Sequence, residues 1–289
     1  KFVFSQVNKS RLKSSFLIRQ WPIFTAFNLA TLAIFYFDFL LAPLYLNLNF
    51  ILTVGLLVAL QSIFESKEKN FIRKTFQYYL MPEVVDELMK NPEKLKLGGE
   101  RKMVTILFSD IRGFTSISET MSPEELTHLV NKYLSAMTEV IIQRRGLLDK
   151  YIGDAIMAFW GAPLPNPKSA ADACRAAYGM LARLRELNTS WKSQGIPELR
   201  IGVGINTGEV IVGNMGSEKR FNYTIMGDAV NFGSRLEGLN KTYETECLIS
   251  ETTKKEIENE PEFFIRELDL VIVKGKKEPK KIFELIERP

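Results

Sequence analysis

The feature that most constrains this chain is a long apolar block without basic residues. No Lys or Arg occurs from residue 20 to residue 66, and most side chains there are apolar. Two stretches in the block, Trp21–Ala42 and Leu44–Phe64, are long enough to cross the core of a bilayer, which takes about 20 helical residues. Residues 21–64 are therefore predicted to form a transmembrane helical hairpin. The alternative is a buried pair of helices in a soluble protein.

Basic residues lie on both sides of this block. Positively charged flanks stay in the cytoplasm, so both ends of the hairpin are predicted to face the cytosol. Residues 1–20 then form a basic cytosolic segment, and because the chain opens on Lys1 instead of Met, we expect it to be a piece of a longer one. The flanking basic residues are Lys9, Arg11, Lys13 and Arg19 before the block and Lys67, Lys69, Arg73 and Lys74 after it.

Composition excludes several classes of function. A formal net charge of +4 on 289 residues is too small to predict a nucleic-acid partner. His128 is the only histidine, which excludes histidine-based triads and histidine-rich metal sites. Two cysteines, Cys174 and Cys247, do not predict a disulfide framework and fit a reducing compartment. Catalysis would have to use carboxylates, lysine, arginine, the backbone or a metal ion.

Residues 65–100 form a linker between the apolar block and the rest of the chain. Its first half has a helical pattern, with apolar residues close to heptad spacing at Phe71, Ile72, Phe76, Tyr79 and Leu80. Two interpretations stay open. The linker is either a passive tether or a helix that pairs in parallel with a second copy and carries a signal to the domain.

Residues 101–289 are enough for one domain with its own core. The first six expected elements follow the order βαββαβ, so the predicted fold class is α/β, a ferredoxin-like sandwich with additions. The expected elements are a strand Lys102–Asp110, a helix from Ser122 to Gly146, a hairpin within Leu148–Gly161, a helix Lys168–Gln194, strands Leu199–Asn206 and Glu209–Gly213 joined at Thr207-Gly208, a strand Phe221–Met226 and a helix Asp228–Lys241.

Local signals predict where the helices begin. Ser122 followed by Glu125 has the form of a capping box, with Pro at the first helical position. Asn166 is predicted to cap the second long helix. Asp228, at the start of the third, is predicted to be an N-cap and not a metal ligand.

Two carboxylates stand at neighbouring strand ends. Asp110 ends the first strand of the domain, and Asp154 lies in the two-residue turn Gly153-Asp154 of the following hairpin, where Gly can supply a positive φ. Oxygen ligands without histidine suit Mg²⁺ or Mn²⁺, and such ions share the phosphates of a substrate. The pair predicts phosphoryl or nucleotidyl chemistry. The alternative is that both are ordinary turn residues.

Further candidates lie after the first strand and on the third helix. The backbone of residues 111–115 turns at Gly113, where free N–H groups could hold phosphate oxygens. Asn231 and Arg235 are four residues apart and share one face of a helix. The alternative for Arg235 is a solvated surface residue.

Five stretches together resemble the catalytic domain of class III nucleotidyl cyclases, from about Val104 to Leu285. Five motifs in the order and spacing of one family are far more specific than any one of them. The hairpin and linker also resemble those of bacterial membrane-bound adenylate cyclases, here without an extracellular sensor. The five stretches are FSDIRGFTSISE, DKYIGDAIMAFWGAP, GINTGEVIVGNMGS, YTIMGDAVNFGSRLE and VKGKKEPKKIFEL.

The resemblance implies a role for each site residue. It implies two divalent cations, Mg²⁺ or Mn²⁺, held by Asp110, Asp154 and the backbone carbonyl of Ile111. It also implies a homodimer whose sites are shared between chains, and a bacterial inner-membrane protein with its catalytic domain in the cytoplasm. The remaining implied contacts are the Phe114-Thr115 backbone and Lys274 with the β- and γ-phosphates, Asn231 with the ribose, and Arg235 with the α-phosphoryl group.

The resemblance also implies which base is read. The ammonium of Lys150 can donate to N1 of adenine, and the hydroxyl of Thr224 can accept from its 6-amino group. Many members of the family carry Asp where this chain has Thr224, and guanylate-forming members carry Glu and Cys at the two positions. The substrate implied is ATP, with 3′,5′-cyclic AMP and pyrophosphate as products. The alternatives are a guanylate cyclase and a catalytically silent nucleotide-binding module.

Overall fold

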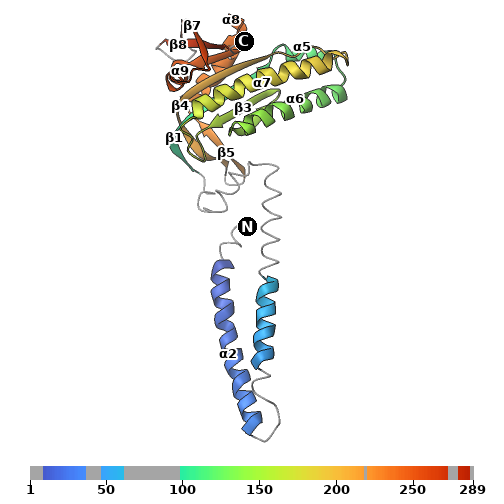
Figure 1. Ribbon diagram of the computed structural model, residues 1–289, viewed down its shortest axis with the longest axis vertical. Coiled ribbons are helices and arrows are strands. Elements are labelled where there is room, and N and C mark those ends of the chain that lie inside the picture. The colour runs from blue at the N-terminus through green and yellow to red at the C-terminus, as the bar shows by residue number, and fades with distance from the viewer. Residues whose placement is uncertain (1–8, 37–46, 62–97, 218–219, 273–278, 287–289) are drawn as a thin grey trace. The chain divides into compact units, whose positions relative to one another are not determined.

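The computed structural model describes residues 9–36, 47–61, 98–217, 220–272 and 279–286 (Figure 1). The chain divides into two compact units, Lys1–Phe76 and Gln77–Pro289. The predicted linker, residues 65–100, lies outside the described residues except for its last three.

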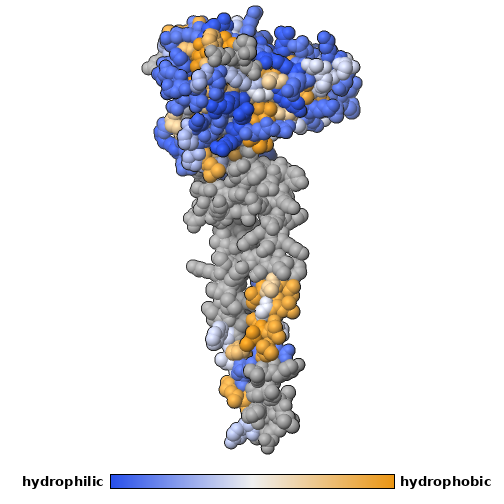
Figure 2. Space-filling model, in the orientation of Figure 1, coloured by the Kyte–Doolittle hydropathy of each residue, from blue (hydrophilic) through white to orange (hydrophobic). Residues whose placement is uncertain are grey.

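The described residues of the N-terminal unit form two helices that pack together. Helix α2 (Lys9–Tyr36) carries Pro22 in its interior, and residues 47–61 form the second helix. Phe50 packs against Phe24 and Phe27, with ring centroids 5.1 and 5.5 Å apart. Many large apolar side chains of both helices are nevertheless exposed, and Figure 2 shows hydrophobic surface on this unit.

The described residues contain no helix that could span a membrane. Within the ranges that the structure describes, none of the helices combines the length and the apolar character needed to cross a bilayer. Both predicted stretches, Trp21–Ala42 and Leu44–Phe64, extend into residues outside those ranges.

The second unit is built on an antiparallel core of four strands. Strand β1 lies between β3 and β4, and β2 pairs with the outer edge of β3, which gives the order β2-β3-β1-β4. The predicted α/β class is confirmed, and the main elements follow in the order βαββαβ. They are β1 (Gly98–Ile111), α6 (Pro123–Gln143), β2 (Leu147–Ile152), β3 (Ala155–Trp160), α7 (Ser169–Lys192) and β4 (Ile201–Ser217), with the short α5 (Phe114–Glu119) after β1.

Over the described residues, the sheet continues beyond β4 to a total of eight strands. β6 runs parallel to β4, and β5 pairs antiparallel with the C-terminal part of β4. β8 pairs with β6, and β7 pairs with β8, both antiparallel. The sheet is therefore mixed. These elements are β5 (Arg220–Met226), α8 (Asp228–Tyr243), β6 (Cys247–Ser250), α9 (Glu251–Glu256), β7 (Phe264–Val271) and β8 (Lys280–Ile286).

Helices α6 and α7 lie side by side across one face of the sheet (Figure 1). The core beneath them buries Tyr133, Met137, Trp160 and Trp191 almost completely. Fully burying an apolar side chain such as Met137 stabilises the fold by about 1.5–3 kcal/mol. A second, smaller core on the sheet includes Val104, Ile106, Met157, Phe159, Val210 and Ile225.

The helix ends agree with the local signals only in part. The capping box is confirmed, because the Ser122 side chain accepts from Glu125 N–H while the Glu125 carboxylate accepts from Ser122 N–H. Helix α6 ends at Gln143, before the predicted Gly146, since Arg145 takes a left-handed conformation with φ 60°. The predicted cap at Asn166 is wrong: its Oδ1 accepts from Lys168 N–H at 2.9 Å, and α7 begins only after Lys168.

One predicted turn is absent from the fold. Thr207 and Gly208 do not separate two strands but lie inside the single strand β4, opposite Thr105 and Val104 of β1. The Thr207 side chain is buried and shares a hydrogen bond with the Thr105 hydroxyl at 3.0 Å. Cross-strand packing here outweighs the local turn preference of a Thr-Gly pair.

Glycines on β4 let helix α8 lie against the sheet. A Cβ atom at Gly204 would come within 2.2 Å of the backbone nitrogen of Glu237, and one at Gly208 within 2.7 Å of the Ala229 Cβ. Between them, Asn206 donates from Nδ2 to the Ala229 carbonyl at 2.8 Å. These contacts fix the position of α8, which carries the predicted site residues Asn231 and Arg235.

Candidate active site

The fold brings Asp110 and Asp154 to one edge of the sheet. Asp110 is the next-to-last residue of β1, and Asp154 lies in the turn between β2 and β3. Because Ser109 of β1 pairs with Ile156 of β3, the turn stands beside the end of β1. Gly153 has φ 67°, as a tight turn of this kind requires.

The two carboxylates repel one another. Burial raises the pKa of Asp110 to about 6, with the charge of Asp154 as the next cause. Asp110 Oδ1 accepts from the N–H of Ile111 at 3.1 Å. Asp154 Oδ2 is buried and accepts no hydrogen bond from the described residues. A buried acceptor without a donor is costly, and a cation between the carboxylates would remove that cost.

These residues fit divalent cations that prefer oxygen ligands. In the part of the chain that the structure describes, no three His, Cys, Asp or Glu side chains come together to hold a metal ion. Two carboxylates are still a sufficient protein contribution for Mg²⁺ or Mn²⁺, which keep waters and share phosphate oxygens of a substrate. The Ile111 carbonyl follows Asp110 directly in the chain and is a candidate third ligand.

A second group joins Lys150 and Thr224. Lys150 is on β2 and Thr224 on β5, and Lys150 Nζ donates to Thr224 Oγ1 at 3.1 Å. The structure thus brings together the two residues predicted to read the base. Asp149 joins them, because its Oδ2 accepts from the Thr224 hydroxyl at 2.5 Å and its Oδ1 lies 3.4 Å from Lys150 Nζ.

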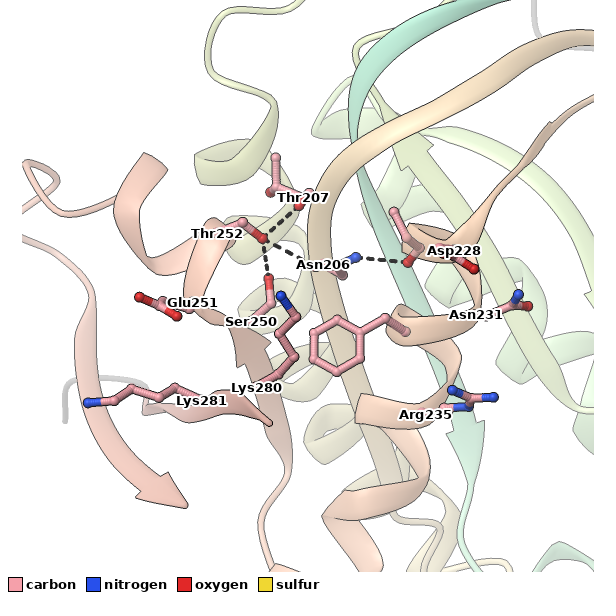
Figure 3. Close-up of a pocket in the computed structure, with 12 residues that line it drawn as sticks. Asn206, Thr207, Asp228, Asn231, Arg235, Ser250, Glu251, Thr252, Lys280 and Lys281 are labelled. Atoms are coloured by element: carbon pink, nitrogen blue, oxygen red, sulfur yellow. Dashed lines mark hydrogen bonds between the residues drawn. The ribbon is translucent and has the colours of Figure 1, made fainter. Parts of the chain in front are cut away.

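A third group lies on α8. Asn231 and Arg235 line a pocket of about 280 Å³ and extend from the same side of the helix (Figure 3). Lys280 and Lys281 of β8 line the same pocket. The N-cap of α8 is Gly227 and not the predicted Asp228, which is the first helical residue and also lines the pocket.

Within one chain the α8 pocket is separate from the other two groups. The lining of the α8 pocket includes neither Asp110 nor Asp154, and neither Lys150 nor Thr224. Each group alone is incomplete for nucleotide chemistry, because metal ligands, base readers and phosphate-binding cations must act on a single substrate.

The other predicted contacts are placed as follows. Phe114 and Thr115 form the first turn of α5, where backbone N–H groups have no partner within the helix. Gly113, with φ 67°, turns the chain into that helix. Lys274 lies outside the described residues, so its role stays a prediction.

Two neighbours of these groups were not predicted from the sequence. The position of Asp149 beside Lys150 was not expected, because the side chains of neighbouring residues in a regular strand point to opposite faces. Glu237 is half-buried near the aspartates. Its partial burial, followed by the charge of Asp110, raises its pKa to about 7, while Arg112 opposes the shift. Its position two residues after Arg235 places it on another side of α8, which helical periodicity could have indicated.

The fold and these groups define a nucleotide-processing α/β domain, and comparison with known proteins identifies the class. Residues 99–286 match the family described as the adenylate and guanylate cyclase catalytic domain. The chain belongs to this family, the class III nucleotidyl cyclases, as the sequence motifs predict.

Individual relatives include both kinds of cyclase. Adenylate cyclase 1 of Rhizobium meliloti (strain 1021) is 37% identical over 215 residues, which cover 73% of this chain and 32% of that protein. The adenylyl cyclase CyaB from P. aeruginosa is 37% identical, with a TM-score of 0.62 over 67% of this chain and 98% of that one. The guanylyl cyclase Cya2 is 39% identical, with a TM-score of 0.60 over 65% and 94%. The chain thus spans about a third of the length of the first curated relative.

Replacing Asp154 by Asn tests the metal site without any measurement of activity. In slightly alkaline buffer with EDTA, Asp154→Asn should melt at a higher temperature than the parent, because one of two repelling charges is gone. Mn²⁺ should stabilise the parent, by about 2.7 kcal/mol at a hundred times its dissociation constant, and should not stabilise the variant. Thermal unfolding with and without Mn²⁺ measures both effects.

The matched control is Glu124→Gln, which removes the same charge at an exposed position on α6. It should keep the full response to Mn²⁺. An equal Mn²⁺ response in Asp154→Asn and the parent would contradict a metal site at this carboxylate.

Proposed function

We propose that this chain is an adenylate cyclase that converts ATP into 3′,5′-cyclic AMP and pyrophosphate. The observation that carries the proposal is the hydrogen bond between Lys150 and Thr224. Adenine has an acceptor at N1 and a donor at its 6-amino group, which match an ammonium donor beside a hydroxyl acceptor. Guanine has the opposite polarity at both positions, so this pair would reject it.

Overall similarity does not decide between ATP and GTP. A guanylyl cyclase structure is as similar to this chain as an adenylyl cyclase structure is, at 39% against 37% identity. The choice of substrate therefore depends on the few side chains that contact the base. Lys150 favours ATP, since its ammonium cannot accept a hydrogen bond from the N1–H of guanine.

The reaction needs an in-line attack of the ribose 3′-oxygen on the α-phosphorus. The bond from that oxygen to phosphorus forms, the bond from phosphorus to the pyrophosphate oxygen breaks, and the 3′-hydroxyl proton is released. Asp110, Asp154 and the Ile111 carbonyl would hold the two divalent cations. When bound, these ions lower the pKa of the 3′-hydroxyl and neutralise charge on the triphosphate.

Protein side chains supply orientation and further charge. Asn231 would hold the ribose so that its 3′-oxygen faces the α-phosphorus, and Arg235 would stabilise charge developing on the α-phosphoryl oxygens. Such a preorganised contact is worth roughly 10²–10³ in rate. Lys274 and the Phe114-Thr115 backbone would bind the terminal phosphates.

A head-to-tail homodimer would unite the separate groups. Asp110 and Asp154 of one copy would meet the base readers, Asn231 and Arg235 of the other. This proposal is supported by exposed apolar residues beside the base readers, namely Tyr151 and Ile152 on β2 and Met226 on β5. Exposed apolar side chains that gather in one patch commonly mark an interface.

The direct test of the activity is cyclic nucleotide formation by the purified chain. We expect cyclic AMP from ATP with Mg²⁺ or Mn²⁺, none with EDTA, and a kcat/KM for GTP at least about 100-fold lower. Chromatographic product analysis with each nucleotide and each metal measures this. A chain that uses GTP equally well would contradict the proposed base reading, and one that forms no cyclic nucleotide would contradict the activity.

Complementation tests the shared site. Asp110→Ala and Arg235→Ala should each be nearly inactive as homodimers. In a heterodimer of the two, one site collects both changes and the other collects neither. Random pairing gives half heterodimers with one intact site each, so co-expression should restore about a quarter of the parental activity. Heterodimers that form but stay inactive would mean that each site is built within one chain.

The apolar block is proposed to anchor the catalytic domain to the bacterial inner membrane. Support comes from the absence of Lys and Arg in residues 20–66, the basic flanks and the exposed apolar side chains of the N-terminal unit. The expressed chain should remain in the membrane fraction after high-salt and carbonate washes and be released by detergent. A chain starting at residue 98 is the control and should fractionate with soluble protein. Release of the longer chain by salt alone would contradict the anchor.

A further inference from the structure

A β-bulge places Asp149 beside the base-reading pair. In the pairing of β2 with β3, Leu148 lies opposite Ala158 and Lys150 lies opposite Met157, so Asp149 is an extra residue without a partner. Consecutive side chains of a regular strand point to opposite faces. The bulge interrupts this alternation, and both Asp149 and Lys150 contact the hydroxyl of Thr224.

The chemistry of the three groups fixes the direction of each hydrogen bond. A carboxylate only accepts and an ammonium only donates, whereas a hydroxyl has one proton and two lone pairs. The Thr224 proton therefore points to Asp149 Oδ2, 2.5 Å away. One lone pair of Thr224 accepts from Lys150 at 3.1 Å. What the hydroxyl can still offer a substrate is a lone pair, so it can only accept.

We infer that Asp149 is a specificity-determining residue, which makes the Thr224 hydroxyl an obligatory acceptor for the 6-amino group of adenine. This inference rests on the proposed function and adds a residue to it. A free threonine hydroxyl could rotate and donate to the 6-oxygen of guanine. With its proton held by Asp149, the Thr224 hydroxyl can only accept, and it would face the 6-oxygen of guanine, which is also an acceptor.

The burial of Asp149 supports a dedicated role. Its side chain is only 1% exposed, while that of Lys150 is 40% exposed. Burying a carboxylate is costly unless it is paired. Burial accordingly raises the pKa of Asp149, and the Thr224 hydroxyl and the Lys150 charge act against that rise. The alternative role is simply that of a counter-ion for Lys150.

The test compares ATP with GTP in the variant Asp149→Leu, which keeps a similar volume and removes the acceptor. The ratio of kcat/KM for ATP to that for GTP should fall at least about tenfold, because the Thr224 proton is then free to turn toward the base. Damage to the fold alone would lower both values together and leave the ratio unchanged. A folded variant with the parental ratio overturns the inference.

A double-mutant cycle with Thr224→Val separates the two roles of Asp149. If Asp149 acts through the hydroxyl, Asp149→Leu should not change the ratio further once Thr224→Val has removed that hydroxyl. If Asp149 serves only Lys150, the ratio should fall equally in both backgrounds, which overturns the inference.

Moving the carboxylate provides a rescue. In Asp149→Leu with Thr224→Asp, a carboxylate at position 224 accepts without needing orientation and also compensates Lys150. This double variant should recover most of the preference for ATP. Should Asp149→Leu fail to fold, the double variant carries the test: a folded and selective protein supports the inference, and a folded and unselective one overturns it.

Binding measurements distinguish this inference from the proposed function. 3′-Deoxy-ATP and 3′-deoxy-GTP lack the attacking hydroxyl, so calorimetry reports base selectivity even if the chain makes no cyclic nucleotide. A parent that forms no product but binds 3′-deoxy-ATP selectively, with loss of selectivity in Asp149→Leu, would overturn the activity and support the role of Asp149. A parent that makes cyclic AMP, with unchanged selectivity in Asp149→Leu, would support the activity and overturn the role of Asp149.

Discussion

The pairing of β1 with β4 is the interaction on which both halves of the candidate site depend. The two strands pair along the whole of β1, from Gly98 opposite Asn214 to Ile111 opposite Ile201. This ladder fixes where β1 ends, and thereby where Asp110 stands. The same ladder keeps β4 continuous through Gly204 and Gly208, where helix α8 makes its closest approach. A strand broken at Gly208 would leave α8 without this surface.

Local signals were sufficient where a residue acts on its immediate neighbours. The capping box of Ser122 and the turn at Gly153 could be predicted from the sequence, because each depends on only a few residues. The continuity of β4 could not, since Thr207 is held by hydroxyl contacts with Thr105 and Thr253, which are far away in the sequence. The predicted turn followed the local preference of Thr-Gly, and distant partners outweighed it.

The contacts of Asp149 could not be predicted from the sequence for a different reason. Alternation along a strand is the basis for assigning side chains to faces, and one inserted residue changes the assignment of its neighbours. The bulge between Leu148 and Lys150 is set by the register of β2 on β3. No residue type in the stretch signals that register. The contacts of Asp149 therefore required the structure, whereas the proximity of Lys150 and Thr224 followed from family motifs.

Helix α8 has two sets of neighbours. Asn231 and Arg235 line the pocket on one side of the helix. Glu237 belongs to another side, where the charges of Asp110 and Asp154 help to raise its pKa and that of Arg112 opposes them. In a head-to-tail dimer, Asn231 and Arg235 would serve one site while Glu237 stands next to the metal carboxylates of the other. The glycines of β4 leave α8 little room to tilt against the sheet. Any movement of this helix would displace Asn231 and Arg235 at one site and Glu237 at the other.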